Sequence, residues 1–558
     1  MMRTYTQLID ACLQEPFDKM VCHFTRPPSL ALGDLSLPCF PLAKKLKKSP
    51  MDIAHELKDA FHSLSFIEQV VAKDGYLNFY FKRRQVIQDT LLEIKHKKHQ
   101  YGSNESGIGK TALIEHTSIN PNASPHVGRA RNALIGDVLK RLMTFEGYKV
   151  NTHYFVNDVG KQIAMLVYAT QHEEKVTFKE LLQHYVRMHE AMKDNPQIEE
   201  EIFKLLYAFE NGDVSVRKSF QNIVDICIKG QVGLFKDLSI NYDTFQYESA
   251  YIFNGALQEV LKQLKTTGNL EEDEEGRLVL NLEAYNIPTK APYLVLSRKD
   301  KTSLYPLRDI AYSMHKAKTN THVNMIVLGE DQKSYHQQVS AALDLLGYTA
   351  PTPVHYSFVL LKDGKMATRE GKVVLLEDFM SLAIEKSMAY MKENNREVDV
   401  TTAKTIAYGA VKYAILKTAN HKNVTFDLEK ALSFEGNTGP YLQYSIARIH
   451  SILDKCQFQE DEQIDYGLLE EDLVYDLILD LLFFNDVVAK ALKDASPHII
   501  ANYVYGLTKK FSTFYHQCSI IHAKSKALQS ARLALIKGVI QVSINALHLL
   551  GINVVKSM

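Results

Sequence analysis

Residues 112–156 follow a strand–loop–helix–strand pattern, which narrowly limits the folds that this sequence can adopt. Its segments follow one another along the chain: 112–116, 117–125, 126–146 and 150–156. The helical segment carries apolar residues at four-residue intervals, Leu134, Val138 and Leu142, and Gly147 closes it. Two strands joined by a helix usually lie parallel in one sheet. The pattern therefore predicts an α/β fold with a doubly wound parallel sheet.

Composition and hydrophobic periodicity divide the remaining sequence into domains. A short alternating strand, residues 76–81, belongs to an N-terminal α/β unit, and the polar stretch 101–109 bounds that unit. A stretch rich in Glu, Lys, Leu and His interrupts the sheet domain, and long amphipathic helices fill the C-terminal third. We predict four domains: an N-terminal α/β domain, 1–107; a Rossmann-like domain, 108–385, with a helical insertion at about 170–290; connecting helices, 386–430; and an all-helical bundle, 431–558.

The charge balance bears on possible partners. Lys plus Arg and Asp plus Glu both number 65, so the net charge is zero. This argues against a general nucleic-acid binder but leaves room for local basic surfaces. The lysine-rich runs 44–48 and 95–99 are candidates for such surfaces, and the alternative is that each is the solvated face of a helix.

Cysteine spacing and hydropathy bear on the compartment. The six cysteines are scattered without a C-x-x-C pair, which supports neither a zinc ribbon nor a disulfide framework. No run of 18 apolar residues predicts a membrane span, and the charged residues 1–19 lack the apolar core of a secretory signal. We expect a reduced, cytoplasmic protein.

The first candidate site is the loop between the first strand and its helix, residues 118–129. Ligands of an open α/β sheet bind in the crevice at the carboxyl ends of its strands. A helix N-terminus there presents unpaired N–H groups that suit phosphate. Gly128 lets a nucleotide approach closely, and His126 can donate to a phosphate oxygen. The alternative is an ordinary turn between a strand and a helix.

The second candidate site is a loop rich in lysine and glycine, residues 364–372. Such a loop can close over a triphosphate and stabilise charge on the departing pyrophosphate. The alternative is a charged surface hairpin.

A resemblance to a known family joins the two sites. His126-Val-Gly-Arg129 resembles the HIGH signature of class I aminoacyl-tRNA synthetases, and the loop 364–372 resembles their KMSKS loop. Further segments resemble the arginyl-tRNA synthetase family in particular, and they occur in the family's order: residues 115–121, 131–137, 156–162, 303–312, 432–444 and 549–552.

The resemblance implies a set of substrate-binding and catalytic residues. Glu115 and Asp309 would face the guanidinium of arginine, because planar carboxylates suit its paired donors. The other implied arginine-binding residues are Tyr305 as a wall, and Ser118, Asn120, Gln332 and His126 around the amino acid's polar atoms. The implied ATP-binding residues are His126, Gly128, Arg129, Lys365 and Met366, and the implied catalytic residues are His126, Gly128, Arg129, Lys365, Arg369 and Lys372.

Two positions depart from the family's patterns. Arg129 stands where HIGH ends in histidine, and Thr368 stands where KMSKS has its second lysine. Arginine keeps a positive donor on a longer side chain. We look to Lys365, Arg369 or Lys372 for the charge that Thr368 lacks. Tyr305 and Asp309 lie four residues apart, so one helical turn could present both; the alternative is simply a helix start.

The resemblance also implies contacts with tRNA. Asn78 and Phe81 match the strand that contacts the tRNA elbow in the family, and the alternative places Phe81 in the core. Tyr441 and Tyr444 share a helix face and could stack on anticodon bases, unless they pack inside the bundle. The final Met558 matches a residue near the anticodon.

The implied function is ATP-dependent activation of L-arginine and its transfer to tRNA(Arg). We expect ATP with Mg²⁺ as a substrate complex, no zinc, no resident metal and no organic cofactor. We also expect a monomer without membrane contact, activation that requires bound tRNA, and no editing. Two rivals remain: a paralogue that binds tRNA without activating arginine, suggested by Arg129 and Thr368, and a different nucleotidyltransferase with an HxGH motif.

Overall fold

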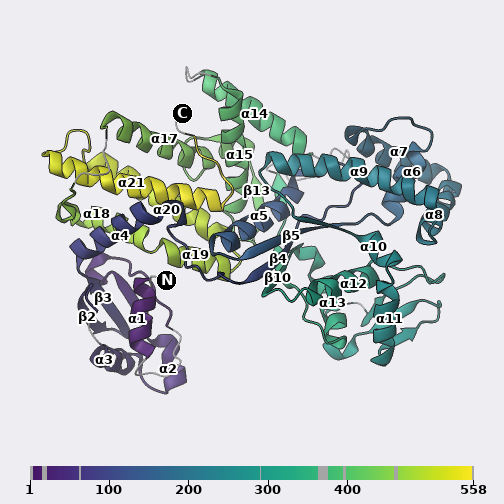
Figure 1. The fold of residues 1–558 in the computed structure, drawn as a ribbon, viewed down its shortest axis with the longest axis horizontal. Helices are drawn as coiled ribbons and strands as arrows, with labels where there is room; N and C mark the ends of the chain where they lie inside the picture. The colour runs from purple at the N-terminus through teal and green to yellow at the C-terminus, as the bar shows by residue number, and fades with distance from the viewer. Residues whose placement is uncertain are drawn as a thin grey trace.

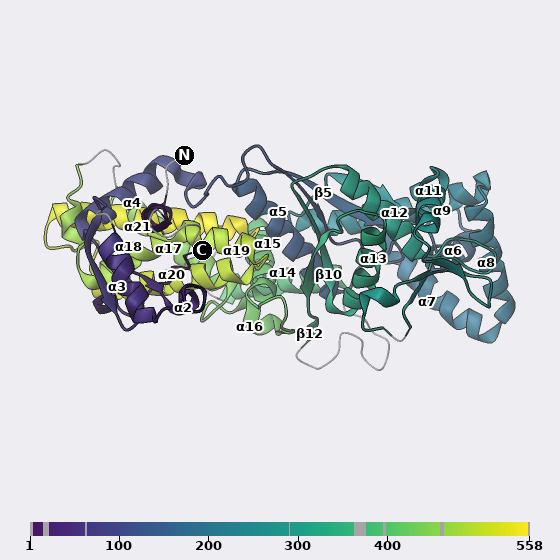
Figure 2. The same cartoon turned by 90° about the horizontal axis from the view of Figure 1, so that it is seen from below.

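The structure is a computed structural model. It describes residues 4–14, 22–61, 64–289, 291–361, 375–393, 398–457 and 463–555. The molecule is elongated, with the main sheet near its middle (Figure 1). The helical bundle and the N-terminal domain lie on one side of that sheet, and the α6–α9 helices lie on the other. The view from below shows the same order along the long axis (Figure 2).

The main sheet has five parallel strands in the order β11-β10-β4-β5-β6. Their bounds are β4 (Thr111–Glu115), β5 (Lys149–Val156), β6 (Thr244–Tyr247), β10 (Val323–Gly329) and β11 (Thr352–Tyr356). The chain starts at the central strand β4, builds to one side, and then returns to build the other side from β10. The strand order reverses between β4 and β10, where such sheets bind their ligands. The predicted doubly wound parallel sheet is confirmed.

Helix α5 (Ala130–Phe145) covers the centre of this sheet and follows the short 3-10 helix η3 (Val127–Arg129). The predicted helix 126–146 is therefore α-helical only from Ala130 onward. Its Arg131 is 1% exposed and donates to the carbonyls of Ser357, Lys422 and Ala419 at 2.6–2.9 Å. Because these carbonyls lie in loops far along the chain, Arg131 joins the sheet domain to the segments that lead into the bundle.

The part between β5 and β10 contains both helices and strands. Helices α6 (Lys161–Thr170), α7 (Phe178–Asp194), α8 (Pro196–Glu210) and α9 (Val214–Asp237) form a cluster with its own apolar core. After β6 come α10 (Glu248–Phe253), α11 (Ala256–Thr266) and an antiparallel sheet of β7 (Leu270–Glu272), β8 (Leu278–Asn281) and β9 (Tyr293–Val295). The predicted helical insertion at about 170–290 thus also holds three strands, β6, β7 and β8, of which β6 is part of the main sheet. Helices α12 (Tyr305–Lys318) and α13 (Lys333–Leu345) flank β10 in sequence.

The C-terminal part is helical, as predicted, apart from one short strand. Strand β13 (Val424–Phe426) pairs with β12 (Val359–Leu361) and ties this part to the sheet domain. The helices are α14 (Leu376–Glu393), α15 (Val400–Leu416), α16 (Leu428–Leu432), α17 (Gly439–Lys455), α18 (Asp472–Leu482), α19 (Phe484–Lys493), α20 (His498–Gln517) and α21 (Lys526–Leu549). Among the described helices, none is long and apolar enough to cross a bilayer.

The N-terminal domain packs an antiparallel sheet, β1-β3-β2, against helices. Its elements are α1 (Tyr5–Gln14), β1 (Leu35–Pro38), α2 (Phe40–Leu46), α3 (Pro50–Ala60), β2 (Ile67–Lys73), β3 (Tyr76–Phe81) and α4 (Arg83–Lys97). Ion pairs attach it to α18: Arg26 to Asp476 and Asp480, and Arg83 to Asp472 at 2.7 Å. These contacts place the domain beside the helical bundle, as Figure 1 shows.

Candidate functional site

A cavity of about 130 Å³ lies at the switch point of the main sheet. It brings together Glu115 from the end of β4, Ser118 from the loop that follows, Asp309 from α12 and Gln332 from the turn after β10. These four residues come from three segments that are far apart in the sequence. The sheet topology therefore assembles four of the seven predicted arginine-binding residues in one hollow.

Two carboxylates give this cavity its chemistry, and each is anchored. Glu115 is 5% exposed and forms an ion pair with the ammonium of Lys316, which is 1% exposed. Asp309 accepts a hydrogen bond from the hydroxyl of Tyr335 on α13. A carboxylate has about four acceptor positions, so each anchored carboxylate can still accept from a ligand.

Burial changes the proton affinity of Asp309. Desolvation raises the pKa of its carboxyl to about 6; the Tyr335 hydrogen bond opposes this rise, and the negative charge of Glu115 adds to it. The positive charge of the nearby Arg308 also opposes the rise in the Asp309 pKa. Arg308 is itself held in a buried ion pair with Glu248, at 2.5 Å. Asp309 is thus an anion at neutral pH that gains a proton in mildly acidic solution.

The loop after β4 is held in an unusual conformation. Thr117 and Ser118 both have positive φ, 70° and 40°, which is rare for residues other than glycine. Asn132 of α5 fixes this turn by accepting from the Thr117 amide at 2.5 Å and donating to the Val327 carbonyl at 2.8 Å. The Phe155 amide donates to the Ser118 hydroxyl at 3.1 Å. Backbone strain of this kind is typical of sites where a side chain must face a ligand.

His126 directly precedes η3 and is its N-cap residue. Its backbone forms an isolated bridge with Leu375, and the Leu376 amide donates to the Pro125 carbonyl at 2.8 Å. The ring Nδ1 is buried and makes no hydrogen bond within the described residues. Desolvation, with the neighbouring Arg129, lowers the pKa of His126 to about 4. The imidazole is therefore neutral at physiological pH and can donate one N–H.

Three predicted arginine-binding residues do not line the cavity: His126, described above, Tyr305 and Asn120. Tyr305 is 55% exposed and packs against Tyr335, with ring centroids 5.1 Å apart. It does not line the cavity itself but packs against Tyr335, which does, so its role as a wall stays a prediction. Asn120 is exposed and bonds to Gln162 at 3.1 Å and to Asn157 at 2.9 Å. Asn157 lines the cavity, which places Asn120 one residue away from it.

Several predicted residues lie outside the part of the chain that the structure describes. They are the loop residues Lys365, Met366, Arg369 and Lys372, together with Thr368 and the terminal Met558. Leu375, the first described residue after the loop, is close to the site because it pairs with His126. Of the other predicted nucleotide-binding residues, Gly128 is buried in η3, and Arg129 is exposed and lines the cavity.

The predicted elbow contact needs a correction. Phe81 is 1% exposed and packs edge-on against Phe66 and Tyr5, so it belongs to the core of the N-terminal domain and cannot stack on a base. Asn78 is 7% exposed and bonds to Ser36 across the β1–β3 pair. The alternative weighed for Phe81, a core position, is the correct one.

Tyr441 and Tyr444 of α17 are accessible enough for the predicted stacking on anticodon bases. Tyr441 and Tyr444 are both partly exposed. Tyr441 packs edge-on against Tyr505 of α20, with ring centroids 6.0 Å apart. Neither ring is enclosed by the bundle core, so their proposed role in stacking on bases stays a prediction.

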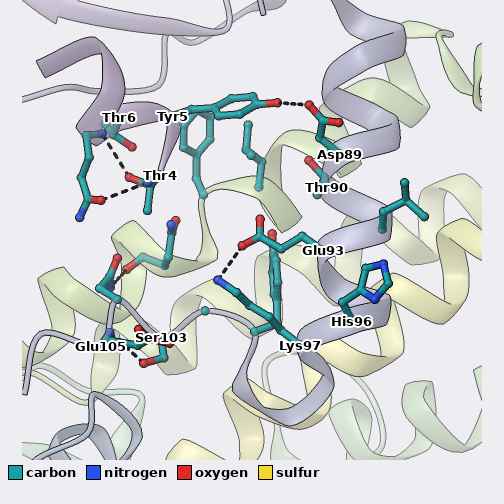
Figure 3. A pocket seen from close by; sticks show the side chains of 18 residues that line it. Thr4, Tyr5, Thr6, Asp89, Thr90, Glu93, His96, Lys97, Ser103 and Glu105 are labelled. Carbon is teal, nitrogen blue, oxygen red and sulfur yellow. Dashed lines mark hydrogen bonds and ion pairs between the residues drawn. The ribbon is translucent and has the colours of Figure 1, made fainter. Parts of the chain in front are cut away.

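A larger pocket, of about 470 Å³, lies where α1, α4 and the α18–α19 corner meet (Figure 3). Its polar groups bond to one another: the Tyr5 hydroxyl donates to Asp89 at 2.8 Å, and Lys97 pairs with Glu93 at 2.7 Å. We assign this pocket to the packing of the N-terminal domain on the bundle, because Asp89, Glu93 and Lys97 already have partners within it.

Sequence reasoning missed the residues that anchor the two carboxylates. Lys316 and Tyr312 line the cavity, and both follow Asp309 on α12 at helical spacing. The spacing 309, 312, 316 marks one face of a helix and could have identified them. Helical spacing from Asp309 could not identify Tyr335, because Tyr335 lies on another helix, α13.

Comparisons with known proteins agree over the whole chain. The description "tRNA synthetases class I (R), catalytic domain" matches residues 90–428. "DALR anticodon binding domain" matches residues 442–558, and "Arginyl tRNA synthetase N terminal domain" matches residues 3–81.

Relatives and solved structures give the same result. The chain is 36% identical to an arginine–tRNA ligase of Methanocaldococcus jannaschii over 562 aligned residues, covering 97% of each. It is 33% identical to one of Clostridium kluyveri, covering 95% of each. The structure of Thermus thermophilus arginyl-tRNA synthetase superposes with a TM-score of 0.87 at 27% identity, over 100% of both chains.

Proposed function

The chain belongs to the arginyl-tRNA synthetase family of class I ligases, and we propose that it loads L-arginine onto tRNA(Arg) through an arginyl-adenylate. Family membership over the whole length excludes an unrelated HxGH nucleotidyltransferase. ATP, with Mg²⁺ bound as part of that substrate, supplies the energy. The enzyme acts as a cytoplasmic monomer in this proposal.

The observation that carries the proposal is the pair of anchored carboxylates, Glu115 and Asp309, at the switch point of the sheet. A guanidinium is planar and offers five N–H donors, so it suits acceptors from two directions. Arginine would enter with its guanidinium between these carboxylates. Its α-ammonium and α-carboxylate would then point along the ends of β4 and β10 toward His126.

The polar residues along that path bind the amino acid's backbone atoms. Ser118 and Gln332 line the cavity, and Asn120 stands behind Asn157 at its edge. In the proposal, Ser118, Gln332 and Asn120 hold the α-ammonium and adjacent polar atoms. His126 donates to the α-carboxylate and to ATP, which its neutral imidazole permits.

The first step is an in-line displacement at phosphorus. An oxygen of the arginine carboxylate attacks the α-phosphorus of ATP, a new P–O bond forms, and the bond to the β-phosphate oxygen breaks. The electron pair leaves with pyrophosphate. Since the nucleophile is the substrate's own, the protein contributes positioning and charge stabilisation.

The charge on the departing pyrophosphate is stabilised by basic residues of the two signatures. Arg129 lines the cavity, and His126 and Gly128 lie just before it in the chain. We assign Gly128 to the ATP site from its place in the family's signature. We assign Lys365, Arg369 and Lys372 to the pyrophosphate and Met366 to the ATP site, following their places in the family's loop. The basic residues take the place of the lysine absent at Thr368.

The second step transfers arginine to the tRNA. The terminal ribose hydroxyl attacks the carbonyl carbon of the adenylate, the ester bond forms, and AMP leaves with the bonding electrons. Tyr441, Tyr444 and Met558 contact the anticodon in this proposal. Bound tRNA is needed before activation proceeds.

Specificity arises in the arginine pocket alone. Free lysine has one ammonium and cannot satisfy two separated carboxylates, and citrulline lacks the charge. An unsatisfied buried carboxylate lowers binding by on the order of 10²–10⁴-fold. We therefore propose that no editing step exists.

The proposal is tested by aminoacylation. Purified protein is incubated with ATP, Mg²⁺, total tRNA and radiolabelled arginine, and acid-precipitable label is counted. Arginine should be transferred, whereas labelled lysine and citrulline should stay at background. Transfer of lysine, or no transfer of arginine while tRNA still binds, contradicts the proposal.

A further inference from the structure

We propose that Lys316 is a specificity residue of the arginine pocket: its ammonium neutralises one of the two carboxylates, so that the pocket matches a single positive charge. This inference rests on the proposed function and assigns a role to a residue that the resemblance did not identify. Lys316 does not contact the reacting atoms, and it acts through Glu115.

The geometry of Lys316 supports this role. Its ammonium pairs with Glu115 and lies 4.2 Å from the ring centroid of Tyr312. The side chain is 1% exposed, and the Glu115 side chain is 6% exposed. A buried ammonium is expensive to desolvate, and here a carboxylate and an aromatic face compensate it. The lysine is therefore held at the bottom of the cavity as a fixed charge.

The charges around the pair show what Lys316 balances. Glu115 and Asp309 contribute two negative charges, and Lys316 contributes one positive charge, which leaves the carboxylate end with a net charge of −1. An arginine guanidinium brings +1. The titratable and charged groups that face this end from the surrounding elements are Tyr312, Arg308 and His315 of α12, Tyr335 and His336 of α13, His153 of β5, Tyr251 and Glu248 of α10, and Arg129 near η3.

His153 and His336 do not alter this balance at neutral pH. Desolvation is the main cause that lowers the pKa of His153 and of His336, in each case to about 4. Arg308 and Glu248 pair with each other and contribute no net charge. Arg129 also lines the cavity, but it is exposed, so solvent screens its charge.

The arrangement also explains how lysine is rejected. A free lysine would have to place its ammonium near Glu115, where the Lys316 ammonium already lies. Two ammonium groups would compete for one carboxylate and repel each other in a desolvated site. A guanidinium spreads its charge and reaches both carboxylates at once, so it can share Glu115 with Lys316.

The first test compares the arginine KM of the wild type, Lys316→Met and Lys316→Arg between pH 5.5 and 9. The Lys316 charge lowers the pKa of Asp309 and the Glu115 charge raises it, so without Lys316 the Asp309 carboxyl should retain its proton to higher pH. The pH below which KM rises should therefore move up by about one unit or more in Lys316→Met. At pH 9 its KM should approach the wild-type value, and Lys316→Arg should keep the wild-type profile.

The matched control is Lys318→Met, two residues away on the same helix and exposed. It should leave both the profile and kcat unchanged. A Lys316→Met enzyme whose KM follows the wild-type pH profile overturns the proposal, because a purely structural lysine would change activity without moving the profile.

A second set of variants keeps the test decisive should Lys316→Met fail to fold. Glu115→Gln leaves Lys316 without its partner, so its charge should repel the guanidinium. The double variant Glu115→Gln/Lys316→Met removes that charge and should bind arginine about tenfold more tightly than Glu115→Gln alone. Equal or weaker binding in the double variant overturns the role of Lys316. A wild type that charges no arginine instead contradicts the proposed function itself.

Discussion

Gly136 of α5 lies so close to His116, the residue that follows β4, that a β-carbon at position 136 would be 2.2 Å from the His116 Cγ. This contact sets the distance between the helix and the central strand that carries Glu115. His116 is fully enclosed, and its Nδ1 lies 2.8 Å from the Thr117 hydroxyl at the start of the strained turn. The packing of one glycine thus determines where the first carboxylate and the turn after it lie.

Gly136→Ala should therefore destabilise the protein and impair arginine binding. The added methyl group must displace the His116 ring, and overpacking of this kind costs about 1–3 kcal/mol. Thermal unfolding and the KM for arginine measure the two effects. Gly233→Ala is the matched control, since that helical glycine has open space around its Cα. The control should raise stability by roughly 0.5–1 kcal/mol and leave KM unchanged.

Asp309→Asn should raise the KM for arginine far more than it changes the KM for ATP. The substitution keeps the shape but removes the charge that faces the guanidinium, which should cost on the order of 10²–10⁴-fold in kcat/KM. Asp344→Asn is the control, because Asp344 also accepts from a tyrosine hydroxyl, that of Tyr285 at 2.7 Å, but lies outside the cavity. If both variants behaved alike, Asp309 would have no special place in arginine recognition.

The KM for arginine should depend on pH with a midpoint near the pKa of Asp309, about 6. Above that pH the carboxyl is ionised and can bind the guanidinium. Below it, the proton must be removed first, so KM should rise by up to about tenfold for each further pH unit. The KM for ATP is the internal reference, because His126 stays neutral down to about pH 4. A flat arginine profile down to pH 5 would refute this assignment.

Tyr441→Ala and Tyr444→Ala should weaken tRNA binding without changing arginine binding. Loss of a stacked aromatic ring costs about 1–3 kcal/mol per base, which corresponds to roughly 5–150-fold in the KM for tRNA. Tyr207→Ala removes a tyrosine that is 55% exposed on α8 and serves as the control. Unchanged tRNA binding in both α17 variants would place the anticodon contact elsewhere.

Local patterns predicted the parts of the fold that local interactions determine. The strand and helix of residues 112–146 follow from periodicity and from one closing glycine. Glu115 and Ser118 line the cavity because residues at the end of a central strand, or just after it, lie at the carboxyl edge of the sheet.

The remaining features depend on contacts between distant segments. Lys316 meets Glu115 across 201 positions of sequence, so its role depends on how α12 lies over the sheet. Phe81 lies in an alternating strand, and only the packing of Tyr5 and Phe66 decides which face of that strand is buried. Tyr305 and Asp309 share a helix as predicted, but α13 inserts Tyr335 between Tyr305 and the cavity edge.

The most direct test of the central claim is arginine-dependent exchange of pyrophosphate into ATP, measured with and without total tRNA and with lysine as a control. The account predicts exchange only when arginine and tRNA are both present. Exchange supported by lysine would contradict the pocket assigned to Glu115 and Asp309, and robust exchange without tRNA would contradict the proposed order of steps. No exchange under any condition, with tRNA binding retained, would indicate an inactive paralogue and point to Arg129 and Thr368.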